Sequence, residues 1–295
     1  MALLKVLGDI VRHPLNRGRR LAALAGFVRW QVASRLAPGD IVFPWVNGSR
    51  FLVRTGDNGL TGNVYSGFQE FPEMGFLLHL LRRDDLFVDV GANAGSYTIL
   101  ACAALGARGI CLEPIPATYR RLLDNIRINH LEARVECLNS GAGREPGTLR
   151  FSSALDVGNR VMATGEERAD AIMVPMDTLD RLLAGRAPTL IKIDVEGYEM
   201  AVLEGAMQTL AATTLQAVIM EVNGSGAIYG FDEASLLARM QGLGFAACQY
   251  DPLQRALTLL PVGLRPDNIL FVRDVERVRS LLAQAPTVTV LGTPL

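Results

Sequence analysis

Residues 87–97 read Phe-Val-Asp-Val-Gly-Ala-Asn-Ala-Gly-Ser-Tyr, and this stretch decides the fold. An apolar run over 86–90 carries Asp89 near its end, breaks into a glycine turn over 91–95, and leads into helix-forming residues over 98–105. Strand, glycine turn and helix in this order open the nucleotide-binding half of a doubly wound sheet. The sequence therefore predicts a Rossmann-like α/β fold, with a ligand held at the glycine turn.

The glycine turn departs from the dinucleotide fingerprint. That fingerprint, Gly-x-Gly-x-x-Gly, lets the backbone approach a pyrophosphate. Here Asn93 and Ser96 occupy the second and third glycine positions, and Asp89 would repel phosphate oxygens. An acid beside the turn suits a ligand with a cationic centre. S-adenosylmethionine, which carries a sulfonium and an amine, is therefore the predicted cofactor.

A second acid follows the next expected strand, residues 107–113. Glu113 ends that strand about twenty residues after the glycine turn, where βαβ units place the acid that accepts both ribose hydroxyls. The alternative is that Glu113 only caps the helix that opens around Pro116. Because Asp89 and the glycine turn also indicate a cofactor site, we predict that Glu113 binds the cofactor.

Two further expected strands end in acids. Asp194 lies near the end of the strand expected at 189–195 and Glu196 directly after it, and Glu221 lies near the end of the strand expected at 215–222. Doubly wound sheets bind ligands outside the carboxyl ends of their strands. Asp194, Glu196 and Glu221 are therefore the predicted catalytic residues, which would hold an acceptor hydroxyl in line with the methyl group and take its proton.

Other roles for these acids remain open. Glu196 and Glu199 would also be favourable at a helix N-terminus, and Glu221 could instead pair with a buried cation such as Lys192. Oxygen ligands from Asp194, Glu221 and Asn223 would suit Mg²⁺, but their spacing neither requires nor forbids a metal. No metal ligand is predicted.

The composition is that of an ordinary globular protein. The chain has 295 residues, a formal net charge of −1 and 49% hydrophobic residues. A charge near zero argues against a dedicated nucleic-acid binder. The four cysteines lack the spacing of metal ligands, which predicts free thiols in a reducing cytoplasm.

Residues 1–36 differ from the rest in charge, with seven Lys and Arg against the single acid Asp9. The longest uncharged run there, 21–28, is far shorter than the ~18 apolar residues of a membrane span, and no secretory cleavage signal follows it. Apolar residues at helical spacing predict a helix packed on its own domain, the alternatives being a helix at a membrane interface or on a partner. The predicted stripe consists of Leu21, Leu24, Ala25, Val28, Val32 and Leu36.

The remaining pattern predicts four regions. A basic amphipathic helical extension covers 1–38, a cap region covers 39–83, a Rossmann-like domain covers 84–284, and a tail covers 285–295. In the cap region we expect a hairpin that turns at Asn47-Gly48, a loop over 56–67 and a helix over 72–81. Strand and helix then alternate, the expected strands including 148–151 and 171–174, as in a mostly parallel sheet.

These residues resemble the FkbM family of S-adenosylmethionine-dependent methyltransferases. The resemblance rests on residues 87–98, on Glu-Pro-Ile-Pro-Ala-Thr-Tyr at 113–119, and on Ile-Lys-Ile-Asp-Val-Glu-Gly at 191–197 followed by Val-Leu-Glu-Gly-Ala at 202–206. It implies a seven-stranded sheet in which the last strand, 268–272, is antiparallel and lies beside the strand that starts near Leu215.

The resemblance also implies an O-methyltransferase that acts on hydroxyls of sugars, glycans or natural products. The implied cofactor residues are Asp89, Gly91, Asn93, Gly95 and Glu113, with Tyr97 beside them and Asn139 and Ser140 as the adenine-side turn. Residues 139–143 read Asn-Ser-Gly-Ala-Gly where relatives often have Asn-Ala-Ala-Leu-Gly, which weakens the adenine assignment. The rival hypothesis is an inactive cofactor-binding or scaffold protein, tethered through its basic N-terminal helix.

Overall fold

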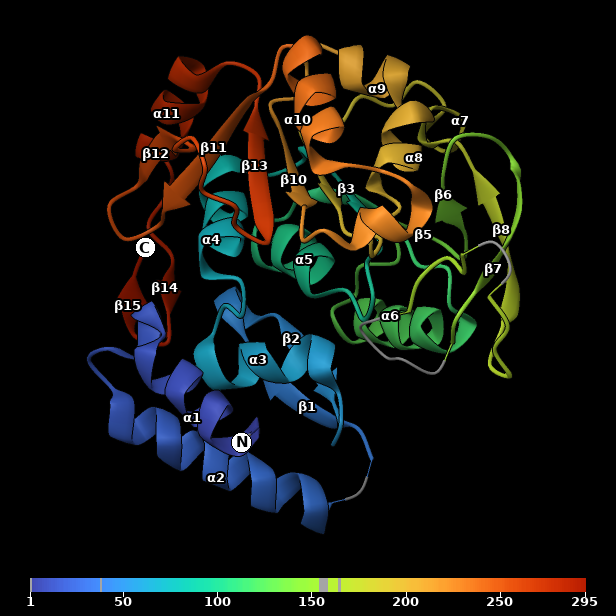
Figure 1. Ribbon diagram of the computed structural model, residues 1–295. Helices are drawn as coiled ribbons and strands as arrows, with labels where there is room; N and C mark the ends of the chain where they lie inside the picture. Colours follow the sequence, from blue (N-terminus) through green and yellow to red (C-terminus); the bar gives the residue numbers. More distant parts are fainter. Residues whose placement is uncertain (1, 38, 154–158, 164–165) are drawn as a thin grey trace.

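A computed structural model describes residues 2–37, 39–153, 159–163 and 166–295, and it confirms the Rossmann-like α/β class (Figure 1). In the described residues the main sheet has eight strands in the order β12-β11-β13-β10-β9-β3-β4-β5. Their bounds are β3 Leu86–Val90, β4 Arg108–Leu112, β5 Val135–Leu138, β9 Leu190–Ile193, β10 Ala217–Glu221, β11 Ala246–Asp251, β12 Ala256–Leu259 and β13 Asn268–Val272.

The strand order confirms the predicted position of the last strand. β13 runs antiparallel between β10 and β11, with Leu270 opposite both Ile219 and Cys248. The predicted number of seven strands is wrong by one, because β12 pairs with β11 as an antiparallel hairpin at the sheet edge. Of its four residues only Leu257 is buried, and Leu259 is 60% exposed, so this short edge strand packs little apolar surface on the core.

Helices cover both faces of the sheet. One face packs against α4 (Phe71–Leu80), α5 (Ser96–Ile99) with its π-helical continuation to Ala104, α6 (Pro116–Ile128) and α11 (Val275–Ala283). The other packs against α7 (Leu179–Leu183), α8 (Glu199–Glu204), α9 (Met207–Ala211) and α10 (Glu233–Gly242). Strand side chains alternate between faces. Asp89 and its register partner Lys192 therefore share the face that packs against α4 and α5.

Two small sheets lie outside the main one. β6 (Gly141–Ala142), β8 (Ile172–Asp177) and β7 (Gly147–Phe151) form a three-stranded sheet, so the strands expected at 148–151 and 171–174 pair with each other and not with the main sheet. In the tail, β14 (Thr289–Val290) and β15 (Thr293–Pro294) form a short hairpin that the sequence did not predict.

The N-terminal region forms a layer of its own below the sheet in Figure 1. It comprises α1 (Ala2–Arg12), α2 (Arg20–Leu36), the hairpin of β1 (Ile41–Pro44) and β2 (Arg50–Val53), and α3 (Asn58–Ser66). The hairpin turns where predicted, with both Asn47 and Gly48 at positive φ. The loop predicted over 56–67 is wrong, because α3 occupies most of it. Burial of Leu60 against Phe51 and Val53 overrides the low helix propensity of this Gly- and Asn-rich segment.

The predicted packing face of α2 is also wrong. Ala23, Phe27, Trp30 and Ser34 are buried, whereas the stripe residues Leu21 and Leu36 are 84% and 80% exposed. The buried set and the exposed stripe have the same helical spacing but are offset by two residues, about 200° around the helix. Since both faces carry apolar residues, periodicity alone could not choose between them.

An asparagine on α6 and another directly after this helix bond the N-terminal hairpin, and the first also bonds the glycine turn. Asn125 is buried; its Oδ1 accepts a hydrogen bond from the Leu52 amide at 2.8 Å, and its Nδ2 donates to the Ala94 carbonyl at 2.9 Å. One turn later, Asn129 pairs with both backbone groups of Arg50 at 2.8 Å. The two side-chain amides therefore bond the backbone groups of Arg50 and Leu52 on the free edge of β2, as a neighbouring strand would.

We expect Asn125→Ala to lower the free energy of unfolding by about 1–3 kcal/mol, because the amide of Leu52 and the carbonyl of Ala94 lose their partner. Urea unfolding measures the change, with Arg120→Ala at an exposed position of the same helix as the control. Equal stability of the two variants would show that water replaces the asparagine.

Candidate active site

A cavity of about 310 Å³ opens at the carboxyl ends of β3, β4, β9 and β10. The glycine turn, the loops after β4 and β9, the small sheet and helices α3 and α4 all contribute to its wall. The wall contains six of the predicted cofactor residues and all three predicted catalytic residues: Asp89, Gly91, Asn93, Tyr97, Glu113, Ser140, Asp194, Glu196 and Glu221.

The glycine turn requires glycine for a steric reason. Gly91 has a φ of +84°, and a Cβ built on it would lie 1.8 Å from the carbonyl oxygen of Asp194. Gly95, at a φ of +92°, faces Leu122 and not the cavity, so its role is to let α6 approach α5. Asn93 also has a positive φ, of 49°, which asparagine tolerates better than most residues. The turn thus brings the β3 and β9 loops into direct contact.

Glu113 joins the glycine turn to the start of α6. Its Oε2 accepts from the Asn93 amide at 3.0 Å and its Oε1 from the Ile115 amide at 2.8 Å. Burial raises the pKa of Glu113 to about 7, although these two amides oppose the rise. Glu113 thus bonds the residue before α6 and none of the first-turn amides of that helix, and its carboxyl group also lines the cavity. Each oxygen retains a lone pair for a hydroxyl donor.

Asp89 lies beneath the glycine turn and is 1% exposed. It accepts a hydrogen bond from the Thr98 hydroxyl at 2.6 Å. Burial raises the pKa of Asp89, whereas the positive charge of Lys192 and the Thr98 hydrogen bond work against that rise. The acid predicted to face a cationic ligand therefore has one cation beside it already.

Lys192 is that cation, and it is almost completely buried. Its Nζ lies 2.6 Å from Oδ2 of Asp194 and 4.7 Å from the ring centroid of Tyr97. Burial opposes the charge of Lys192, yet the carboxylates of Asp194, Glu70 and Asp89 outweigh burial and raise its pKa above the ordinary value. The Tyr97 hydroxyl donates a short hydrogen bond to Glu70, which closes this side of the cavity.

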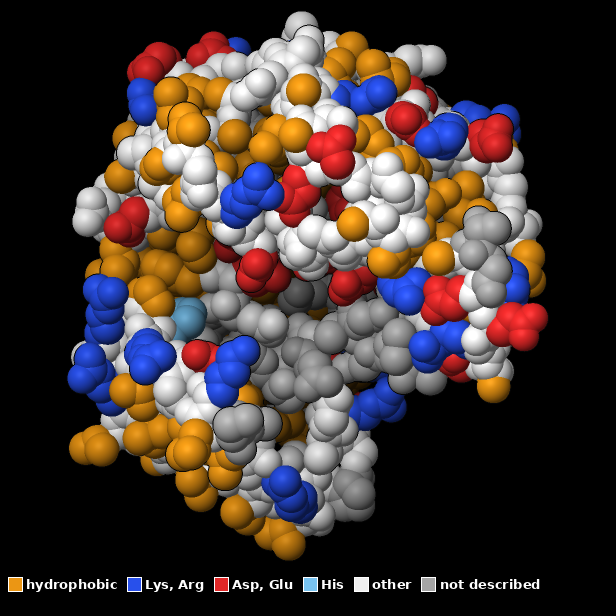
Figure 2. Space-filling model, viewed as in Figure 1, with side chains coloured by type: hydrophobic (Ala, Val, Ile, Leu, Met, Phe, Trp, Pro, Cys, Tyr) orange, Lys and Arg blue, Asp and Glu red, His pale blue; other side chains and the backbone are white. Residues whose placement is uncertain are grey.

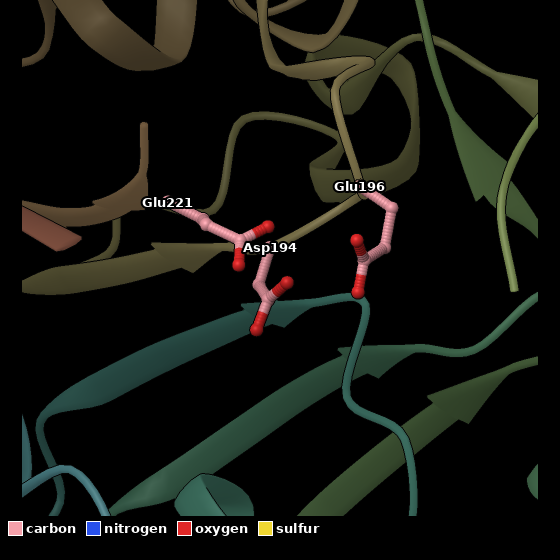
Figure 3. A group of neighbouring side chains, drawn as sticks. All are labelled: Asp194, Glu196 and Glu221. Carbon is pink, nitrogen blue, oxygen red and sulfur yellow. The ribbon is translucent and has the colours of Figure 1, made fainter. Parts of the chain in front are cut away.

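The three predicted catalytic acids converge. Figure 3 shows the carboxyl groups of Asp194, Glu196 and Glu221 gathered at the ends of β9 and β10. One oxygen from each lies within 4.8 Å of the others. Glu196 stands in the turn with a φ of 54°, and Glu199 closes that turn by accepting from the amides of Val195 and Gly197 at 3.2 and 3.1 Å. Glu199 is therefore a structural residue of the turn.

The carboxyl groups of this cluster differ in pKa. Burial and the charge of Asp194 raise the pKa of Glu196 to about 7. Burial, Asp194 and Glu196 together raise the pKa of Glu221 to about 9. Within the described residues, Oε2 of Glu221 is buried without a hydrogen-bond partner, and the ion pair of Lys192 is with Asp194. The direct pairing of Glu221 with Lys192 considered from the sequence is therefore not observed.

The carboxylates of this cluster could bind a hard cation, but the set differs from the one considered from the sequence, which included Asn223. Asn223 is exposed and its Oδ1 accepts from the Ser225 amide at 3.0 Å, whereas Glu196 lies beside Asp194 and Glu221. Their oxygens are of the type that Mg²⁺ prefers, and Lys192 already neutralises part of the negative charge.

The sequence of this chain matches that of a known protein family. The model of the FkbM methyltransferase domain matches residues 89–246, which is more than half of the chain. The chain belongs to the FkbM methyltransferase family. The predicted cofactor of the chain, S-adenosylmethionine, is thereby confirmed.

Individual relatives are distant. The hexuronic acid methyltransferase AglP of Haloferax volcanii is 28% identical over 148 residues, which are 50% of this chain and 59% of that protein. A solved FkbM methyltransferase from Methylobacillus flagellatus is 17% identical, covers 72% of this chain and 52% of its own, and superposes with a TM-score of 0.45. TrmK of M. capricolum, solved with S-adenosylhomocysteine, is 8% identical over 68% of each chain, with a TM-score of 0.40. This chain thus spans little more than half of the first two.

In this member of the FkbM family, one of the two residues expected in the adenine-side turn lines the cavity and the other does not. Ser140 lines the cavity, and its Oγ donates to the carbonyls of Gly141 and Pro175 at 3.0 Å. The Asn139 side chain instead donates to the carbonyls of Glu113 and Pro114 at 2.8 and 3.0 Å, so it fixes the loop that presents Glu113.

Sequence reasoning missed part of the wall. Phe151 and Tyr198 line it, although they come from segments that lie apart from the glycine turn in sequence. The Tyr198 ring packs edge-on against Tyr229 at 5.3 Å, which makes an aromatic rim beside the acids. Lys192 did carry a signal, because a lone cation inside a buried apolar strand requires a partner.

Protonation of Glu221 predicts a pH dependence of stability. Its pKa is about 9 when folded against an ordinary value of 4.5, so the folded protein holds this proton more tightly than the unfolded chain does. The resulting stabilisation is complete below 4.5 and is lost as the pH rises towards 9.

We therefore expect the ligand-free Glu221→Gln variant to match the wild type near pH 4.5 and to be more stable than the wild type near pH 8.5, because only the wild type must take up a proton at this position on folding. Urea unfolding at both pH values measures this, with the exposed Glu276→Gln as the control. Parallel pH profiles for wild type and Glu221→Gln would contradict the prediction.

Proposed function

We propose that this protein transfers a methyl group from S-adenosylmethionine to a hydroxyl oxygen of a sugar, glycan or natural-product acceptor. The glycine turn and Glu113 would hold the cofactor, and the cluster of Asp194, Glu196 and Glu221 would hold the acceptor. Membership of the FkbM family supports the methyl transfer. The placement of the two ligands and the class of acceptor are our proposal.

The charge of the cavity is the observation that supports it most. Among the described residues of the wall, six carry carboxyl groups and one, Lys192, carries an ammonium. Figure 2 shows red acidic side chains bordering the hollow in this face of the molecule. Such a cavity favours a ligand with a sulfonium and an amine and disfavours a pyrophosphate. Of these residues, Glu113 is the one that would accept the ribose hydroxyls.

When bound, the cofactor supplies an electrophilic methyl group, and the protein must position and activate the acceptor oxygen. Asp194, anchored by the ion pair with Lys192, is suited to orient an acceptor hydroxyl. Glu196 has a pKa of about 7, close to the value at which a general base is most effective at neutral pH. Glu221, with a pKa of about 9, would stay protonated and donate a hydrogen bond to the acceptor.

A hydroxyl-rich acceptor fits this cluster because hydroxyls donate to carboxylates. AglP, which shares 28% identity over half of this chain, is named for methylation of a hexuronic acid, which supports a sugar-type acceptor. Which hydroxyl compound is methylated requires a screen with labelled cofactor.

We expect calorimetry to detect binding of S-adenosylmethionine and S-adenosylhomocysteine, with no competition from NAD. Glu113→Gln, which keeps one acceptor oxygen for the two backbone amides, should weaken cofactor binding by about 1–3 kcal/mol. Asp124→Asn, on the exposed face of α6, is the control. Tight NAD binding, or unchanged affinity in Glu113→Gln, would place the cofactor elsewhere.

Asp194→Asn should lower turnover of a native acceptor by about 10²-fold, the cost of a misplaced acceptor oxygen, while cofactor affinity changes little. Single-turnover transfer of the labelled methyl group measures the rate, and chelator-treated wild-type protein tests the need for a cation. Normal turnover in Asp194→Asn would make this residue structural. Cofactor binding without transfer to any screened acceptor would favour the inactive scaffold.

A further inference from the structure

The outer surface of α2 carries an apolar stripe that no part of the described chain covers. Its residues are Leu21, Ala25, Val28, Val32 and Leu36, which recur every three or four positions and so share one side of the helix. Leu21 and Leu36 are more than three-quarters exposed, and Val28 and Val32 are more than half exposed. A run of this length is unusual on a helix whose opposite side already packs on the domain.

Helix α1 extends the same kind of surface. Leu3 and Leu4 are 59% and 76% exposed, while Ile10 of this helix packs against Ala23 and Phe27 of α2. Figure 2 shows orange hydrophobic side chains along the lower edge of the molecule, where Figure 1 places α2. The two helices therefore present apolar side chains outward while a separate set joins them to each other and to the domain.

Basic side chains accompany the apolar ones. Arg29 and Arg35 flank the α2 stripe on its two sides, since each is adjacent in sequence to a stripe residue and turned about 100° from it. Lys5, Arg12, Arg17 and Arg20 are also exposed, against the single acid Asp9. In the described part of the chain none of these six cations forms an ion pair, and Arg35 donates to Oε1 of Gln31 on its own helix at 2.7 Å, so no acid of the described residues neutralises their charge.

We propose that the α1–α2 surface binds an anionic lipid bilayer, with the apolar stripe in the interface and the cations on lipid phosphates. Apolar side chains bordered by Arg and Lys are the pattern of helices that lie in a membrane interface. A second copy fits this surface less well, because two such faces would bring their cations together. In the described residues no helix is long and apolar enough to cross a membrane, so the contact is peripheral.

Contacts made by α3 connect the α1–α2 surface to the candidate active site. Tyr65 of α3 packs against Phe27, and its hydroxyl accepts from Gln31 of α2 at 2.8 Å, while Gly59 and Asn63 of the same helix line the cavity. One helix thus separates the bilayer-binding surface from the cavity. The surface itself is argued without reference to the proposed methyl transfer.

The test uses the full chain and vesicle cosedimentation. Vesicles of phosphatidylcholine alone are compared with vesicles that contain about 30% phosphatidylserine, at salt from about 0.05 to about 0.5 M. The stripe variant combines Leu21→Ser, Val28→Ser, Val32→Ser and Leu36→Ser, and the charge variant combines Arg29→Glu and Arg35→Glu. Matched controls replace exposed residues elsewhere: Val262→Ser with Leu264→Ser, and Arg120→Glu with Arg277→Glu.

We expect salt-sensitive binding to the anionic vesicles only. The charge variant should lose at least about 25-fold in affinity, because each basic residue near the bilayer contributes about fivefold. The stripe variant should lose at least about tenfold, and both controls should bind like the wild type. Melting temperatures should not change, since every replaced side chain is exposed. If the stripe variant has a lower melting temperature than the wild type, the test of bilayer binding rests on the charge variant.

Three results would overturn the proposal. The first is the absence of binding to anionic vesicles at low salt, and the second is equal binding by wild type and charge variant. The third is a concentration-dependent dimer that the stripe variant abolishes, without any vesicle binding by the wild type, which would assign the surface to a second copy.

Discussion

A buried ammonium surrounded by carboxylates is the constraint on which the candidate active site depends. Lys192 lies inside the sheet, 2.6 Å from Asp194 and against the Tyr97 ring, with Asp89 beside it in register. Without this cation the acids at the ends of β3, β9 and β10 would face one another with no compensating charge, which a folded protein tolerates poorly. Even so, the pKa values of Glu113, Glu196 and Glu221 rise to about 7, 7 and 9. The carboxyl groups of the cavity therefore outnumber its cations, which favours a positively charged ligand.

Close backbone contacts hold these acids in place. A side chain at Gly91 would collide with the Asp194 carbonyl, and one at Gly197 would collide with the backbone of Ser225. The loops after β3, β9 and β10 are thus packed backbone to backbone, and a shift in one displaces the others. This explains why glycine turns and acidic residues recur together in the sequence: the glycines let the loops approach, and the acids then converge on one cavity.

The sequence predicted the features that depend on local chemistry. The strand, turn and helix around Gly91 and the acids at strand ends such as Glu113 and Asp194 carry recognisable patterns, and the antiparallel last strand followed from the family resemblance. What the sequence could not predict depends on tertiary packing. Both faces of α2 are apolar, and the packing of Trp30 against the hairpin core and of Phe27 against Tyr65 determines which one is buried. Phe151 lines the cavity because it belongs to the small sheet of β6, β8 and β7, and nothing near Phe151 in sequence indicates this.

The most direct test of the central claim is a crystal structure of the protein with S-adenosylhomocysteine. The account predicts the ribose hydroxyls on Glu113, the adenosyl group against the turn that contains Gly91 and Asn93, and the sulfur on the side of the cavity bordered by Asp194. A ligand bound away from Glu113, or one whose sulfur lies far from the cluster of Asp194, Glu196 and Glu221, would contradict it.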